Sequence, residues 1–125
     1  MTTGFSALRG ECPMQLQHVN KGFPVSDAVA KDLARLEELW IYASAASDGQ
    51  GPWLFGSYSL ADVFYAPVCA RIIGYDLPVS KAAYSYCETT LTDPAFKRWR
   101  AEGLEVTYDP FPYDMGGETQ DWPFP

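Results

Sequence analysis

The chain has 125 residues, 47% of them hydrophobic, and a net charge of -7. It is long enough for one domain with a core and too apolar to be disordered throughout. Its negative charge excludes nucleic acid as an expected partner, because phosphates would repel it. No segment approaches the roughly 20 apolar residues of a membrane span. The three cysteines have neither metal-site nor disulfide-framework spacing, so we expect a reduced cytoplasmic protein with no metal.

Apolar residues at helical spacing predict two helices in the first part of the chain. A short helix is expected over 3–12, followed by a loop over 13–25 that is rich in glycine and proline. Ser26 is a suitable N-cap for a second helix, which should end near Ser47. One face of that helix carries an apolar stripe: Val29, Leu33, Leu36, Trp40 and Ala43.

The third helix is predicted over 59–74 by a strong local start signal. Ser59 and Asp62 are three residues apart, the spacing of a capping box, in which each side chain accepts a hydrogen bond from the backbone of the other residue. A continuous apolar run follows, which indicates a buried helix. Residues 53–55, Trp-Leu-Phe, have no helix or strand pattern, and we expect them to fill part of the core from a loop.

Two more helices and an irregular tail complete the predicted fold. A fourth helix is expected over 79–91, and a fifth from the cap Asp93 to Gly103, with Phe96 and Trp99 facing inward. Residues 104–125 combine prolines, glycines and aromatics, so they should lie on the domain or on a partner rather than form a long helix. No segment has a convincing strand pattern. The predicted fold class is therefore all-α, a bundle of about five helices.

The central motif and its flanks resemble one family. Gly-Pro-Trp-Leu-Phe-Gly at 51–56, with Ser-Tyr-Ser-Leu-Ala-Asp at 57–62, resembles the start of the central buried helix in the C-terminal domain of the glutathione transferases. Asp-Pro-Ala-Phe-Lys-Arg-Trp at 93–99 is similar to a later helix of that domain. Gly-Phe-x-x-Leu-Arg from residue 4 is similar to its first helix in bacterial members. The resemblance covers 1–103 and leaves 104–125 as the tail.

The resemblance implies that the glutathione site and the substrate site lie in two different domains. In that family a thioredoxin-like domain binds glutathione, the co-substrate, and carries the catalytic residue. This chain would then be the helical substrate-site half, inactive alone, with no catalytic residue and with part of a homodimer surface. Its implied partner is a thioredoxin-like domain, from the same gene or a separate chain. The resemblance implies substrate contacts for Thr2, Phe5, Arg9 and Trp122.

Three of these residues also have a structural interpretation. Phe5 is alternatively a core residue, Arg9 a solvated or interface charge, and Trp122 a side chain packed on the chain's own surface. Ser59 and Asp62 are interpreted as structural, because nothing places the single histidine, His18, near them. The competing function is a non-enzymatic docking module built on the same helices. The face that would meet a thioredoxin-like domain is expected to expose apolar side chains around Phe5 and the central helix, and this patch should drive self-association.

The cysteines are expected to differ in accessibility. Cys69 lies in the apolar run and should be an inert buried thiol, and Cys12 lies beside Glu11, which disfavours the thiolate. Cys87 is expected to be partly exposed and thus the best candidate for modification.

Overall fold

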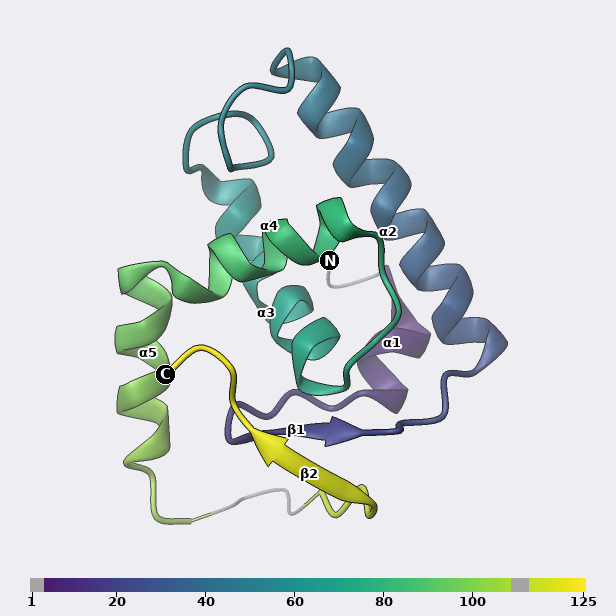
Figure 1. Cartoon of the computed structure of the whole chain (residues 1–125), viewed down its shortest axis with the longest axis vertical. Helices are drawn as coiled ribbons and strands as arrows, with labels where there is room; N and C mark the ends of the chain where they lie inside the picture. The colour runs from purple at the N-terminus through teal and green to yellow at the C-terminus, as the bar shows by residue number, and fades with distance from the viewer. Residues whose placement is uncertain (1–3, 109–112) are drawn as a thin grey trace.

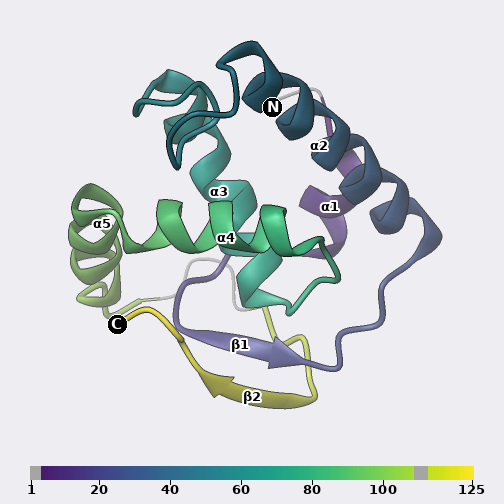
Figure 2. The same ribbon diagram turned by 45° about the horizontal axis from the view of Figure 1, so that its top comes forward.

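The computed structural model describes residues 4–108 and 113–125. Within these ranges the chain forms five helices and two short strands. The helices are α1 (Ser6–Glu11), α2 (Asp27–Ala46), α3 (Leu60–Gly74), α4 (Lys81–Thr92) and α5 (Pro94–Leu104), and the strands are β1 (His18–Lys21) and β2 (Glu118–Asp121). In Figure 1, α3 lies between α2 and α5, α4 crosses α3, and the strands form the base. Figure 2 shows the C-terminus beside α5.

Three helices begin at side-chain caps, two of which, Ser26 and Asp93, are predicted from the sequence. Ser26 accepts from the backbone N–H of the third helical residue of α2 at 3.1 Å, and Ser80 does the same for α4 at 3.2 Å. Asp93 caps α5 at 2.9 Å, with proline at the first helical position. Phe96 is buried as expected, but the inward orientation predicted for Trp99 is wrong, because its side chain is 48% exposed.

The first helix is shorter than predicted and depends on its neighbours. It begins only at Ser6, after Phe5 in a left-handed conformation with φ 55°, and no side chain of its own caps it. Instead the carboxylate of Asp32 in α2 accepts the N–H of Leu8 at 3.0 Å. Arg71 of α3 donates to the Cys12 carbonyl at 2.9 Å. The end of α1 is thus held by α2 and α3.

The all-α prediction is wrong in one respect, because a two-stranded antiparallel sheet joins the loop 13–25 to the tail. His18 pairs with Asp121 and Lys21 with Glu118. Each strand has only four residues, and every β2 side chain is exposed. Strands this short and polar show no alternation of apolar residues, so their sequence carries no strand signal. An ion pair between Lys21 and Asp76 joins β1 to the turn after α3.

The core extends from the α2 stripe through α3 and α4, and the tail contributes to it. The predicted stripe residues of α2 are all buried. Trp122, just after β2, is only 6% exposed and belongs to the same core cluster. The Arg100 guanidinium lies 5.1 Å from the centre of the Trp122 ring and donates to the Leu16 carbonyl at 2.8 Å. The tail is thereby tied to α5 and to the loop after α1.

Candidate functional site

The capping box at the start of α3 is the centre of a larger hydrogen-bonded knot. Both halves of the box form, and Asp62 accepts the Ser59 backbone N–H at 2.8 Å and its hydroxyl at 3.2 Å. The second carboxylate oxygen accepts the Leu54 backbone N–H at 3.2 Å and the Tyr86 hydroxyl at 2.9 Å. Asp62 is 0% exposed. Four donors therefore satisfy a fully buried carboxylate, which agrees with a structural role for Asp62.

The knot fixes two segments outside α3, the loop before it and the helix α4. Tyr86 comes from α4, and burial, proximity to Cys69 and its hydrogen bond to Asp62 all raise the pKa of its hydroxyl, which stays a donor. Leu54 comes from the loop before α3 and is 5% exposed, so the expectation of a core-filling loop is confirmed for it. Phe55 departs from that expectation, because it is 49% exposed.

Two glycines let this loop close on itself. Gly51 has φ 82°, and a Cβ placed on it would lie 2.2 Å from the carbonyl oxygen of Gly56. Gly56 has φ 84°, and its Cβ would lie 2.9 Å from another backbone oxygen. Side chains at either position would force the backbone apart. The compact turn places Trp53 against Tyr58, with ring centres 4.8 Å apart.

A pocket of about 420 Å³ lies between α2, this loop and α4. Its aromatic walls are Trp40, Trp53 and Tyr86, and the rings of Trp40 and Tyr86 meet edge to face at 4.7 Å. Hydroxyl groups also line it, including those of Ser44 and Thr89. The volume is in the range of about 300–1,000 Å³ that small-molecule sites occupy. Because Leu54 and Tyr86 both line the pocket and both bond to Asp62, the knot shapes its wall.

One carboxylate lies at this pocket. Glu37, half-buried on α2, accepts the backbone N–H of Ser80 with both oxygens, at 3.1 and 3.3 Å. Ser80 is the N-cap of α4, so the positive end of that helix holds the carboxylate in place. Glu37 is the charged side chain among the described residues that line the pocket.

The residues that the resemblance implies for substrate contact lie elsewhere. Thr2 lies outside the described residues. Phe5 is half-buried against the core, and Arg9 is exposed on α1 with Arg71 near it, while Trp122 is buried against Arg100. Phe5, Arg9 and Trp122 are not among the residues lining the 420 Å³ pocket. Trp122 thus packs on the chain's own core, as its structural interpretation predicts.

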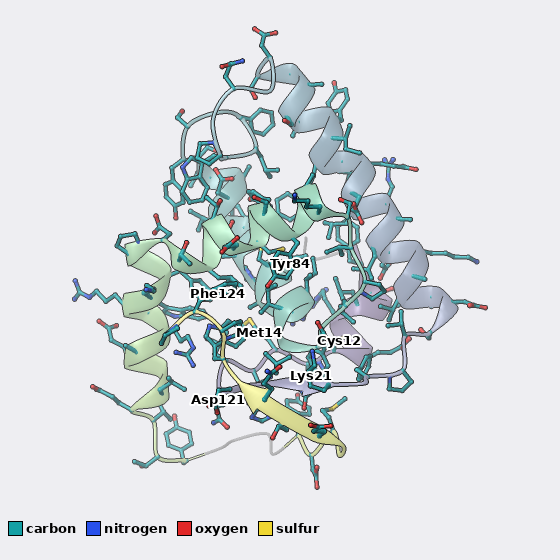
Figure 3. The ribbon with its side chains drawn as sticks, in the orientation of Figure 1. Cys12, Met14, Lys21, Tyr84, Asp121 and Phe124 are labelled. Carbon is teal, nitrogen blue, oxygen red and sulfur yellow. The ribbon has the colours of Figure 1, made fainter. Side chains whose placement is uncertain are left out.

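A second, smaller hollow of about 150 Å³ lies under the sheet. Figure 3 labels three of its lining residues, Lys21, Tyr84 and Asp121, which come from β1, α4 and β2. The ion pair between Lys21 and Asp76 forms at this hollow.

All three thiols are buried, which corrects the expectation for Cys87. Cys12, Cys69 and Cys87 are each 0% exposed and free of disulfides. Burial raises the pKa of Cys12 to about 11, with a smaller contribution from Glu11. Cys87 contacts Cys69 across α3 and α4, and this contact, together with burial, raises its pKa as well. The buried residues Ala83, Tyr86 and Cys87 follow helical spacing, so Cys87 lies on the same side of α4 as Tyr86, and the expected exposure is wrong.

The first turns of α3 present an apolar surface. Leu60, Val63 and Phe64 are 73%, 45% and 66% exposed and are spaced three and four residues apart, so they share one side of the helix. Tyr58, immediately before the helix, is 50% exposed. We call these four side chains the α3 face. Clustered exposed apolar residues are typical of surfaces that bind other proteins.

Comparison of the chain with known protein families, curated proteins and solved structures finds no match. Among the helices of 4–108 and 113–125, none combines the length and apolar character of a membrane span. The same ranges contain no cluster of three or more histidine, cysteine or acidic side chains that could hold a metal ion.

Proposed function

We propose that this chain is the helical half of a glutathione transferase-like protein and acts by docking through the α3 face. The observation that carries the proposal is the exposure of Leu60, Val63 and Phe64 beside a fully buried capping box. The box supports the family resemblance, because the matching residues open the central helix and Asp62 is buried within it. The face supports docking, since water contact with these side chains costs free energy that a partner would remove.

The partner in this proposal is a thioredoxin-like domain, which would bind glutathione and supply the catalytic residue. The complete protein would conjugate glutathione to hydrophobic electrophiles in the cytoplasm. The nucleophile in this reaction is the thiolate of glutathione, so the dependence follows from placing the glutathione site in the partner. The chain alone would therefore show no transferase activity.

The proposal is tested by titrating the chain with the isolated thioredoxin-like domain of a bacterial glutathione transferase. We expect binding to the wild type and loss of binding in Leu60→Lys/Phe64→Lys. A matched control, Tyr42→Lys/Leu104→Lys, adds the same charge at exposed apolar positions away from the face and should bind normally. Turnover of a chromogenic aryl halide with glutathione by the 125-residue chain alone, above a heat-denatured control, would contradict the proposal.

The second candidate is a non-enzymatic docking module built on the same helices. The same α3 face favours it, because such a face is useful to any protein partner. The two candidates separate in the titration: a chain that self-associates through the face but ignores the thioredoxin-like domain fits the docking module alone.

A further inference from the structure

The pocket between α2, α4 and the loop 51–54 combines aromatic walls with a single fixed negative charge. Trp40, Trp53 and Tyr86 provide the aromatic surface, and Glu37 provides the charge. Lys81 follows Ser80 in sequence, but it does not line the pocket. The overall charge of -7 adds a negative potential over the whole surface. A ligand that enters this pocket therefore meets aromatic faces and a carboxylate without a competing cation on the lining.

The Glu37 carboxylate retains capacity for a ligand. A carboxylate has about four lone-pair positions. The single Ser80 N–H points between the two oxygens of Glu37 and is shared by them, so the outer lone pairs remain available to a ligand. Because this contact fixes the side chain, little conformational entropy is lost when a second donor arrives. The group is also only half-buried, so it stays reachable from solvent.

The aromatic walls favour a ligand that carries an apolar group next to its charge. Contact of that group with tryptophan and tyrosine rings adds to the attraction between the charge and Glu37. The ring nitrogen of Trp40 is buried and has no hydrogen-bond partner among the residues that the structure describes, and Tyr65 at 5.6 Å and Tyr86 at 4.7 Å enclose the ring. Trp40 therefore offers the pocket an aromatic surface rather than an accessible donor.

We propose that this pocket binds a small organic ammonium: an amine whose aryl or alkyl group packs against Trp40, Trp53 and Tyr86 while its charged nitrogen pairs with Glu37. This site is separate from the α3 face, and the inference is independent of the proposed docking function. The hydrogen bonds of Asp62 fix the loop and α4, and the bond between Glu37 and Ser80 joins α2 to α4, so the site is formed before the ligand arrives.

The test uses three probes of one shape: phenethylammonium, neutral phenethyl alcohol and anionic hydrocinnamate. Binding is followed through the isotope-labelled indole N–H resonances of the four tryptophans, assigned by Trp→Phe variants. We expect phenethylammonium to shift the resonances of Trp40 and Trp53 and to leave those of Trp99 and Trp122 in place. The alcohol should bind about tenfold more weakly, and the carboxylate should not bind.

Glu37→Gln keeps an acceptor for the Ser80 N–H and removes only the charge. It should weaken phenethylammonium binding about fivefold, while Glu88→Gln, an exposed carboxylate of α4 outside the lining, should leave it unchanged. The comparison of amine and alcohol uses the wild type and so does not depend on the variant. The proposal is overturned if the amine gives no shift or shifts all four tryptophans alike, if the alcohol binds as well as the amine, or if folded Glu37→Gln binds as the wild type does.

Discussion

Substitution of Asp62 by asparagine should expose how much stability depends on the buried carboxylate. Asparagine has the same shape but offers one acceptor oxygen in place of two. The Tyr86 and Ser59 hydroxyls can reverse and accept from the new NH₂ group. The backbone N–H groups of Leu54 and Ser59 cannot reverse, and they lie on different carboxylate oxygens. In either orientation of the amide, one buried N–H therefore faces another donor.

The expected cost follows from that single unpaired group. A hydrogen bond to a charged acceptor contributes about 1.5–3 kcal/mol, and a buried donor left unpaired costs a similar amount. We expect Asp62→Asn to lower the free energy of unfolding by about 3 kcal/mol, which is a large part of the roughly 5–15 kcal/mol of a typical domain. For a chain of 125 residues this corresponds to a fall in Tm of about 10 °C.

The assay is urea unfolding followed by circular dichroism, with Asp48→Asn as the matched control. Asp48 is exposed and has φ 56°, a conformation that asparagine tolerates, so the same change of charge should alter stability by less than about 0.5 kcal/mol. A double-mutant cycle with Tyr86→Phe should show coupling between the two side chains. If Asp62→Asn is as stable as Asp48→Asn, the knot does not carry the stability assigned to it.

Three further results are expected. Trp122→Ala should cost about 3 kcal/mol and speed hydrogen exchange in β1, because the tail loses its buried anchor; unchanged exchange would show that β2 stays paired without it. Gly51→Ala should lower the Tm more than Gly49→Ala does in thermal melts. Both glycines have positive φ, but only at Gly51 would the added Cβ lie within 4 Å of other backbone atoms. Equal losses of stability would show that the positive φ alone causes the destabilisation. The free energy of unfolding should fall as pH rises from 9.0, the ordinary pKa of a thiol, towards 11. The cause is that the pKa of Cys12 is raised to about 11 in the folded chain, so the unfolded chain loses this proton first. In urea titrations across this range Cys12→Ala should make the decline less steep, and an unchanged slope would contradict this prediction.

Local signals in the sequence were sufficient for most helices. Ser26, Ser59 and Asp93 begin their helices as predicted, because a cap acts within one turn and is visible in sequence. The apolar stripe of α2 is buried for a similar reason, since its period is a property of one segment. What depends on distant segments was missed: the pairing of β1 with β2 and the contact between Cys87 and Cys69.

The candidate site illustrates the same limit. The capping box was identified from Ser59 and Asp62, but its bonds to Leu54 and Tyr86 were not, because Tyr86 reaches Asp62 only once α4 has crossed α3. Glu37 was not identified from the sequence, although its spacing of four residues from Leu33 and three from Trp40 places it at the edge of the buried stripe. Only the position of Ser80 at the start of α4 brings it to the pocket.

Sedimentation equilibrium of the wild type beside Leu60→Lys/Phe64→Lys tests the central claim most directly, namely that the α3 face is a protein-binding surface. The face should drive the wild type to self-associate as its concentration rises, while the double variant should stay monomeric and the Tyr42→Lys/Leu104→Lys control should associate as the wild type does. A wild type that remains a clean monomer at high concentration, or a face variant that associates equally well, would contradict the account.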